Sequence, residues 1–388
     1  AHVFERLIQA HSYYSGASVG FFRGNILGLI EDIALLKPTI FPSVPRLLNR
    51  IYDKITAAVN QLPPLKRKLF ELGYAAKREY LYSEGATIHP FWDKLVFSKM
   101  AAVLGGRLRW ILTGAAPISP QTVEFLRIVF CCRVMEGYGQ TEGTGIGTTT
   151  LLHDVAVGHV GPPNPACEVK LVDVADMDYL VSDRPNPRGE LCVRGPSVIR
   201  GYYLMPDKTA ETIDEEGWLH SGDVAELLPN GCFRIIDRKK NLFKLAQGEY
   251  VAPEKIENII ARSPYIAQCF VYGDSLQPHL VAIVVPDEEV VRIWAHSNAL
   301  AHHSFSELCQ LPELHEMLFS DMLYRCKEAA LGGFEIPKAI FVSAEVFSIE
   351  NDILTPTLKM KRNVAQKVYA QQIKHLYEQT TGQIKASL

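Results

Sequence analysis

Apolar and polar residues in the first part of the chain recur with the spacing of amphipathic helices. In one segment the apolar side chains fall at Leu47, Leu48, Ile51 and Ile55. The segment 66–82 mixes lysine, arginine, glutamate and alanine with apolar positions in the same way. Pro42 and Pro45 predict a loop before the first of these helices. We therefore expect residues 1–100 to be mostly helical.

A strand, a turn and a helix are predicted next. Residues 108–112 form a short apolar run that enters the turn 113–117, which is rich in glycine, alanine and proline. A helix is expected to begin near Ser119, with this serine as N-cap and Pro120 in the first helical position. A second strand then leads into the glycine-flanked loop 138–144. This alternation is typical of an α/β domain.

Beyond residue 150 the pattern changes to short β runs between turns, at 168–172, 189–195 and 232–236. After Asp237 we expect a compact α+β region. Its predicted elements are a helix from Pro253, strands at 269–272 and 280–285, helices up to about residue 330, a strand at 339–347, and one amphipathic helix through Val364, Val368, Ile373 and Leu376. The chain is therefore expected to be an α/β protein in three parts, 1–150, 151–237 (β-rich) and 238–388.

Composition excludes several classes of function. The 388 residues are 47% hydrophobic and 21% charged, and the formal net charge of −3 argues against general binding of polyanions such as nucleic acids. Eight cysteines occur without a C-x-x-C pair, which indicates a reducing compartment rather than a zinc site or a disulfide framework. The most apolar candidate for a membrane span, 15–36, is interrupted by polar and charged residues, so no span is predicted.

The chain opens on Ala1 without an initiator methionine, a basic segment or an apolar signal core. We expect the sequence to come from the middle of a larger protein. The lack of a targeting signal then says little about where that protein resides.

The loop Tyr138-Gly139-Gln140-Thr141-Glu142-Gly143-Thr144 has the residue types of a phosphate and metal site. Glycines let backbone N–H groups approach a phosphorylated ligand, and the Thr141 hydroxyl can bond a phosphate oxygen. The Glu142 carboxylate can hold Mg²⁺, which prefers oxygen ligands shared with phosphates. The alternative is a tight turn with a capping threonine.

Four further residues offer matching chemistry. Gly114 and Ala115 are small residues at the end of a predicted strand, where α/β folds bind ligands, although a turn chosen only for packing would look the same. Asp223, expected at a loop tip, can accept hydrogen bonds from two neighbouring hydroxyls, and Arg238 offers a fork of donors to the same diol. The alternatives are a turn residue and a solvated charge.

Lys359 lies in the segment Leu354-Thr355-Pro356-Thr357-Leu358-Lys359. A reaction that joins a carboxylate to a polyphosphate brings like charges together, and an ammonium group near both stabilises its transition state. Lys361 and Arg362 are close enough to be mistaken for this lysine. A basic helix start is the alternative interpretation.

In order and wording these clusters resemble the adenylate-forming superfamily, and most closely its long-chain fatty acid–CoA ligases, over nearly the whole chain. The resemblance implies part of a large N-terminal acyl- and ATP-binding domain with a small β subdomain, followed by a mobile C-terminal domain. It also implies the site residues. Catalysis would depend on Lys359, Thr141 and Glu142, with Glu142 as metal ligand, Lys240 as the hinge of the C-terminal domain, and nucleotide contacts from Gly114, Ala115, Tyr138 (adenine), Gly139, Thr141, Asp223 and Arg238 (ribose).

The implied reaction activates a long-chain fatty acid with ATP and Mg²⁺ to acyl-AMP and pyrophosphate, and then transfers the acyl group to coenzyme A. A complete family member carries a further phosphate loop ending in lysine, and no G-x-x-x-x-G-K-[ST] sequence occurs here. Two alternatives therefore stay open, a truncated non-catalytic nucleotide- or partner-binding protein and a ligase for another acyl or aryl acid. The resemblance places the protein inside the cell, at the cytosolic face of the endoplasmic reticulum or another membrane. Acyl-chain preference and oligomeric state are not predicted.

Overall fold

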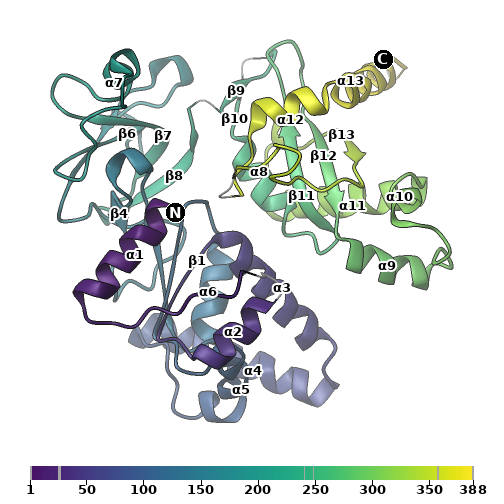
Figure 1. Cartoon of the computed structure of the whole chain (residues 1–388). Coiled ribbons are helices and arrows are strands. Elements are labelled where there is room, and N and C mark those ends of the chain that lie inside the picture. The colour runs from purple at the N-terminus through teal and green to yellow at the C-terminus, as the bar shows by residue number, and fades with distance from the viewer. Residues whose placement is uncertain (1, 25–27, 240, 248, 356–357, 387–388) are drawn as a thin grey trace. The chain divides into compact units, whose positions relative to one another are not determined.

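The computed structural model describes residues 2–24, 28–239, 241–247, 249–355 and 358–386 (Figure 1). The chain divides into two compact units, Ala1–Ile235 and Ile236–Leu388. Among the described residues no helix combines the length and the apolar character needed to cross a bilayer.

The first unit is built on a four-stranded sheet in the order β1-β2-β3-β4. Strands β1 (Ile40–Ser43), β2 (Trp110–Gly114) and β3 (Arg133–Tyr138) are parallel, and β4 (Thr148–Thr149) runs antiparallel to β3. Alternate side chains of the parallel strands, Phe41, Ile111 and Val134, are buried in one core with the helices that connect the strands. Those helices are α3 (Pro45–Asn60), α4 (Pro64–Glu84) and α6 (Pro120–Val129).

Local sequence signals account for the ends of these helices. Helix α6 begins as expected, since the Ser119 hydroxyl accepts from the backbone N–H of Thr122 at 3.0 Å and Pro120 is the first helical residue. The predicted loop at Pro42 and Pro45 is wrong. Pro42 lies within β1, the outer strand of the described sheet, where a missing N–H is tolerated. Pro45 is the first residue of α3, a position where a backbone N–H has no partner within the helix, so the missing N–H of proline costs nothing.

The remaining elements before residue 105 are also helical, which confirms the expected content. They are α1 (Val3–Tyr14), α2 (Leu29–Leu36), a π-helical turn η2 (Asp93–Phe97), α5 (Ser98–Ala101) and a 3₁₀ turn η3 (Ala102–Leu104). Short 3₁₀ turns η4 (Thr141–Gly143) and η5 (Ala175–Met177) follow later in the unit.

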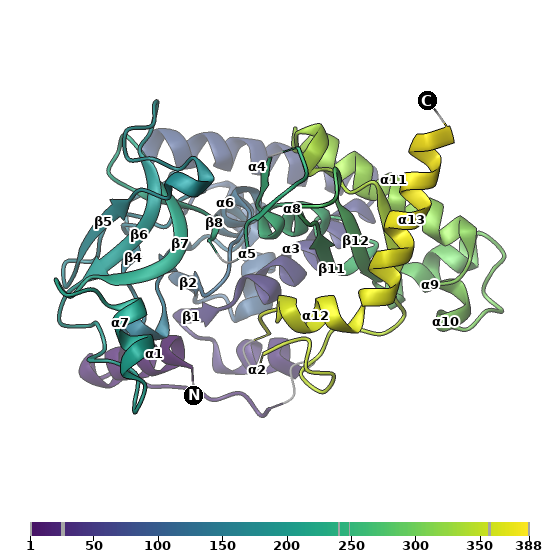
Figure 2. The ribbon, with the colours of Figure 1, turned by 90° about the horizontal axis from the view of Figure 1, so that it is seen from above.

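A second sheet in this unit has the order β5-β6-β7-β8 (Figure 2). Its strands are β5 (Glu168–Val172), β6 (Arg188–Arg194), β7 (Leu219–Leu227) and β8 (Phe233–Arg238), with α7 (Pro206–Thr212) before β7. The three β runs predicted here are confirmed. Asp223, however, lies inside β7 and not at a loop tip. A β-bulge between β6 and β7, together with a φ of +70° at Gly222, bends the backbone locally. The bend interrupts the regular alternation of side chains, so the sequence pattern did not indicate a strand here.

The second unit contains a three-stranded sheet, β11-β12-β13. Strands β11 (Ile266–Tyr272) and β12 (Val281–Pro286) are antiparallel, and β12 runs parallel to β13 (Ala339–Val342). The helices are α8 (Pro253–Ile260), α9 (Glu288–Ser297), α10 (Phe305–Leu308), α11 (Pro312–Glu328), α12 (Arg362–Val368) and α13 (Ala370–Ala386), with a 3₁₀ turn η6 (Gly333–Glu335) and a small ribbon of β9 (Phe243–Lys244) and β10 (Tyr250–Val251).

This sheet is apolar on both faces. Val271 and Val284 belong to a core shared with α8, α9 and α11, whereas Phe270 and Ile283 point into a second core with α12 and α13, drawn in yellow in Figure 1. Because side chains alternate along a strand, a continuous apolar run such as β12 can supply both cores.

Two predictions in this unit need correction. The predicted strand 339–347 ends at Val342, because the Ser343 hydroxyl and Glu345 exchange local hydrogen bonds that turn the backbone. The single C-terminal helix is in fact two, α12 and α13, separated at Tyr369. The Tyr369 side chain is buried against Phe341 and Phe347, and such packing overrides the helical periodicity that predicted one continuous helix.

Candidate functional site

The carboxyl ends of β2 and β3 lie side by side, which brings two of the predicted segments together. Gly114 is in register with Gly137, and a Cβ atom on Gly114 would lie 2.7 Å from the Gly137 carbonyl oxygen. Only glycine fits this close approach without movement of the backbone. Ala115 follows with a φ of +69°, a conformation that turns the chain away from the sheet. Gly114 and Ala115 therefore adjoin the loop that begins at Tyr138.

Glycines shape this loop so that its polar residues are presented outward. A Cβ on Gly139 would lie 1.6 Å from the carbonyl oxygen of Gly145, so no other residue can take its place in this conformation. The Gly145 N–H donates to the Gln140 carbonyl at 3.1 Å and closes the turn η4. Thr141 within that turn is exposed, and Glu142 is half-buried. The hydroxyl and the carboxylate are thus held on a defined turn, as a phosphate and metal site requires.

Asp223 is brought to the same loop from a distant part of the sequence. The Tyr138 hydroxyl donates to Asp223 Oδ2 at 2.5 Å, although the two residues are 85 positions apart. Asp223 is only 4% exposed, and its backbone N–H donates to the Ser221 hydroxyl at 3.0 Å. The carboxylate predicted to bind a diol is therefore already oriented by the aromatic residue predicted to stack on the base.

The Glu142 carboxylate has a partner that sequence reasoning missed. The Tyr202 hydroxyl donates to Glu142 Oε1 at 2.7 Å, and the Ile199 N–H donates to the Glu142 carbonyl at 2.8 Å. Burial and the neighbouring Glu142 carboxylate raise the pKa of Tyr202. A glycine before Tyr202 was the available signal, but nothing in the local sequence indicated which segment this loop would contact.

A carboxylate with this geometry fits Mg²⁺. Magnesium in nucleotide sites is commonly held by one or two protein carboxylates, with substrate phosphates and water as its other ligands. Glu142 supplies such a carboxylate on a turn beside the exposed Thr141. The residues present are sufficient for a metal shared with phosphate.

A row of buried polar side chains runs beneath this edge of the sheet. Ser43, Thr113 and Glu136 occupy neighbouring positions on β1, β2 and β3, because Ser43 is in register with Thr113 and Thr113 with Glu136. All three are buried, and the hydroxyls of Ser43 and Thr113 have no hydrogen-bond partner among the described residues. Burial raises the pKa of Glu136 to about 7, with Arg127 acting in the opposite direction. A carboxyl that titrates near neutrality thus lies two residues before Tyr138.

Lys359 is presented by a short loop in the second unit. The Thr355 N–H donates to the Lys359 carbonyl at 2.8 Å, and the Lys359 N–H donates to the Thr355 hydroxyl at 3.0 Å. Leu358 has a φ of +62°, which tightens the turn. The Lys359 residue itself is half-buried.

The two neighbouring cations are tied to carboxylates of the same unit. Lys361 forms an ion pair with Asp352. Arg362 Nη2 lies 2.5 Å from Glu257 Oε2 in a largely buried pair. Burial raises the pKa of Glu257 to about 7, with the Arg362 charge opposing this. Both neighbours therefore have a structural use within the second unit.

Arg238 is the last residue of β8 and has an exposed side chain. Lys240, the predicted hinge, lies outside the described residues.

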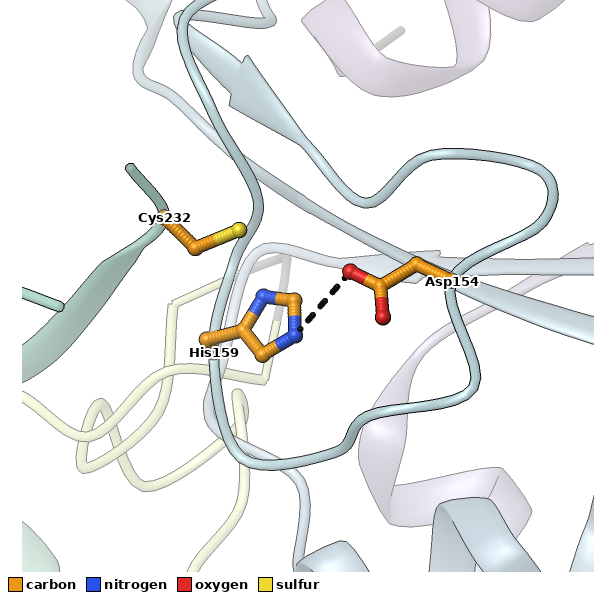
Figure 3. A group of neighbouring side chains, drawn as sticks. All are labelled: Asp154, His159 and Cys232. Carbon is orange, nitrogen blue, oxygen red and sulfur yellow. Dashed lines mark ion pairs between the residues drawn. The ribbon is translucent and has the colours of Figure 1, made fainter. Parts of the chain in front are cut away.

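One further group of polar residues, which the sequence did not single out, lies in the first unit. Asp154, His159 and Cys232 bring their ligand-type atoms within 4.8 Å of one another, with the imidazole between the other two side chains (Figure 3). His159 Nδ1 accepts the Gly161 N–H at 3.1 Å, and Nε2 lies 3.3 Å from Asp154 Oδ2, a separation without full hydrogen-bond geometry. Burial lowers the pKa of His159, although Asp154 opposes this.

This hydrogen-bond pattern determines what the group can do. A neutral imidazole whose Nδ1 accepts carries its proton on Nε2, facing Asp154. No ring nitrogen is then available as a base for the Cys232 thiol, and coordination of a metal would require the bond to Gly161 to break. The group is best described as three polar side chains packed together where the loop 154–161 meets the start of β8.

Residues 1–203 match the family described as AMP-binding enzyme, and residues 255–324 match the AMP-binding enzyme C-terminal domain. Long chain acyl-CoA synthetase 7, peroxisomal, of Arabidopsis thaliana is 48% identical over 377 residues, which are 97% of this chain and 54% of that protein. Long-chain-fatty-acid–CoA ligase 6 of Homo sapiens is 49% identical, over 97% of this chain and 53% of its own length. The chain spans about half the length of the curated relatives it matches.

Solved structures show the same fold. The A domain of carboxylic acid reductase from Segniliparus rugosus, in complex with AMP and a co-purified carboxylic acid, superposes with a TM-score of 0.74 at 29% identity. The superposition covers 98% of this chain and 53% of that chain. The anthranilate CoA ligase AuaEII, with a TM-score of 0.61 and 19% identity over 91% of this chain and 55% of its own, shares the fold.

Proposed function

The chain belongs to the AMP-binding, adenylate-forming enzyme family, and on this premise we propose that the protein it belongs to is a long-chain fatty acid–CoA ligase. Relatives of that description are 48–49% identical over nearly the whole chain. The observation that carries the proposal is the bond from Tyr138 to Asp223, because it joins two predicted nucleotide-binding segments into one polar site.

In the proposed site the nucleotide lies along the carboxyl ends of β2 and β3. Tyr138 stacks on adenine, with Gly114 and Ala115 leaving room beside it, and Gly139 keeps the loop backbone close to the ligand. Asp223 accepts from the ribose hydroxyls, and Arg238 donates to the same sugar. A buried carboxylate is well suited to accept from a diol, since hydrogen bonds to charged groups are about twice as strong as neutral ones.

Catalysis of the first step is electrostatic. The fatty acid carboxylate attacks the α-phosphate and displaces pyrophosphate. Because both reactants are anions, the transition state concentrates negative charge around the α-phosphate. We assign Thr141 to an α-phosphate oxygen, Glu142 to Mg²⁺, and the Lys359 ammonium to the developing charge. A bound Mg²⁺ would offset phosphate charge. Each preorganised donor of this kind is worth on the order of 10²–10³ in rate.

The second step transfers the acyl group to coenzyme A. The thiol of coenzyme A attacks the acyl-AMP carbonyl, and AMP leaves as the anion that Asp223 and Thr141 already hold by its sugar and phosphate. We propose that the second unit turns about Lys240 between the two steps, which removes Lys359 and admits the thiol. We also propose that the protein works at an intracellular membrane surface, such as that of the endoplasmic reticulum, where long-chain acids dissolve.

The proposal is tested by incubating the protein with ATP, Mg²⁺, coenzyme A and a series of fatty and aromatic acids, and identifying the products by mass spectrometry. We expect acyl-CoA and AMP, with long-chain acids preferred when acids compete. Preference for an aryl or short acid would indicate another ligase of the family. If no product forms but an acyl-AMP analogue binds in calorimetry, the protein is a nucleotide-binding protein without turnover, and the ligase proposal is wrong.

A further inference from the structure

The turn that carries Thr141 and Glu142 is fastened to a second loop, formed by residues 196–202. Three bonds join them. The Thr144 hydroxyl donates to the Ser197 carbonyl at 2.5 Å, the Ile199 N–H donates to the Glu142 carbonyl at 2.8 Å, and the Tyr202 hydroxyl donates to Glu142 Oε1 at 2.7 Å. The first bond holds the side chain of Thr144, which caps the turn, and the second holds the backbone of the turn at Glu142. The third holds the carboxylate itself.

The loop is in turn fixed to helix α7. The Tyr202 N–H donates to the Thr209 hydroxyl at 2.9 Å, and that hydroxyl donates to the Met205 carbonyl. Gly201 has a φ of +148°, and a Cβ there would lie 2.8 Å from Thr209 Cγ2. Tyr202 is therefore placed by contacts that do not involve Glu142. Its hydroxyl is a donor held in one position, and this donor can orient the Glu142 carboxylate.

The chemistry of this bond suits a carboxylate that must bind a metal. The Tyr202 hydroxyl donates its proton to Glu142 Oε1, so it acts as a neutral donor and not as a competing anion. The bond engages Oε1, and Oε2 then keeps its lone pairs for a cation. A donor that holds one oxygen of a metal-binding carboxylate orients the other oxygen and limits the conformational entropy lost on binding.

We propose that Tyr202 is a positioning residue, which holds the Glu142 carboxylate in the orientation that binds the magnesium ion of MgATP. This inference rests on the role proposed above for Glu142. It adds the loop 196–202 to the nucleotide site, although Tyr202 itself does not touch the substrate.

The first test needs no activity. Hydrogen–deuterium exchange of the ligand-free protein is compared in wild type, Tyr202→Phe and Tyr203→Phe. The adjacent Tyr203 is 88% exposed and is a matched control. In Tyr202→Phe the amides of Thr144, Gly145 and Ile199 should exchange roughly tenfold faster, because loss of a bond to a charged group releases the turn. Unchanged exchange in Tyr202→Phe, or an equal increase in Tyr203→Phe, overturns the proposal.

The second test is the dependence of acyl-AMP formation on Mg²⁺ concentration. For Tyr202→Phe the Mg²⁺ concentration that gives half-maximal rate should rise about tenfold, with a much smaller change in the rate at saturating Mg²⁺. An equal fall in rate at all Mg²⁺ concentrations would show a general structural role and overturn the positioning role. If wild type itself forms no acyl-AMP, the ligase proposal fails instead, and the Mg²⁺ dependence of ATP binding in calorimetry then decides the role of Tyr202.

Discussion

The hydroxyl of Tyr138 donates a 2.5 Å hydrogen bond to Asp223, and this contact links a loop at the end of one sheet to a strand of the other. The carboxylate is buried, so its charge depends on the donors around it. The pair is therefore both a structural link within the first unit and a candidate part of the nucleotide site.

This link predicts non-additive effects on stability. Tyr138→Phe should lower the free energy of unfolding by about 1–3 kcal/mol, because it removes a donor from a buried carboxylate. Combined with Asp223→Asn, the loss should be smaller than the sum of the two single losses. Urea denaturation followed by circular dichroism measures both. Tyr203→Phe provides the control, since its effect should add simply to that of Asp223→Asn.

Replacement of Gly139 or Gly143 by alanine should have different effects on the binding of a nucleotide analogue. Gly139→Ala places Cβ 1.6 Å from the Gly145 carbonyl oxygen, whereas Gly143→Ala meets nothing closer than Leu219 Cδ2 at 3.7 Å. We expect Gly139→Ala to weaken binding of an acyl-AMP analogue by about tenfold or more, and Gly143→Ala to leave it nearly unchanged. Calorimetric titration of both variants checks this. Equal affinities would show that the loop conformation does not matter for binding.

Replacement of Lys359 or of Lys361 should have different effects on the rate of acyl-AMP formation. Lys359→Met should slow acyl-AMP formation about 100-fold or more, since it removes the cation assigned to the developing charge. Lys361→Met removes an ion pair with the exposed Asp352, and exposed pairs contribute only about 0–1 kcal/mol to stability. Its rate should stay near that of wild type. Single-turnover assays measure both rates, and a similar loss in the two variants would remove Lys359 from its proposed role.

Glu136 should make stability depend on pH. Burial raises its folded-state pKa to about 7 from a usual value of 4.5. The folded protein therefore keeps a proton that the unfolded chain releases, and stability falls as pH rises from 4.5 to 7. Glu136→Gln removes this loss and should stabilise the first unit by about 3 kcal/mol at pH 8, with little gain at pH 5.

Denaturation of wild type and Glu136→Gln at both pH values gives this comparison. Glu71→Gln, on an exposed face of α4, is the control and should follow the wild-type profile. A Glu136→Gln gain that does not change with pH would contradict the raised pKa.

Local features of the sequence predicted much of the fold. The serine and proline at the start of α6 act within one helical turn, and most of the predicted β runs of both units form strands. Such features depend on neighbouring residues, so the sequence is sufficient to find them.

Features that depend on long-range pairing were missed. Tyr202 meets Glu142 across 60 positions, and its partner could not be inferred from either segment alone. Asp154, His159 and Cys232 come together where the Val160 N–H donates to the Phe233 carbonyl, a bond that joins a loop to a distant strand. The break at Tyr369 likewise follows from aromatic packing against another element.

The central claim is that these polar segments hold one nucleotide on which a fatty acid is adenylated. Exchange of labelled pyrophosphate into ATP tests it most directly, measured with Mg²⁺ and a long-chain fatty acid and without coenzyme A. The account predicts exchange that requires the fatty acid, proceeds without coenzyme A, and is strongly reduced in Lys359→Met. Wild-type protein that forms acyl-CoA but shows no exchange, or exchange only with coenzyme A present, would contradict an acyl-AMP intermediate.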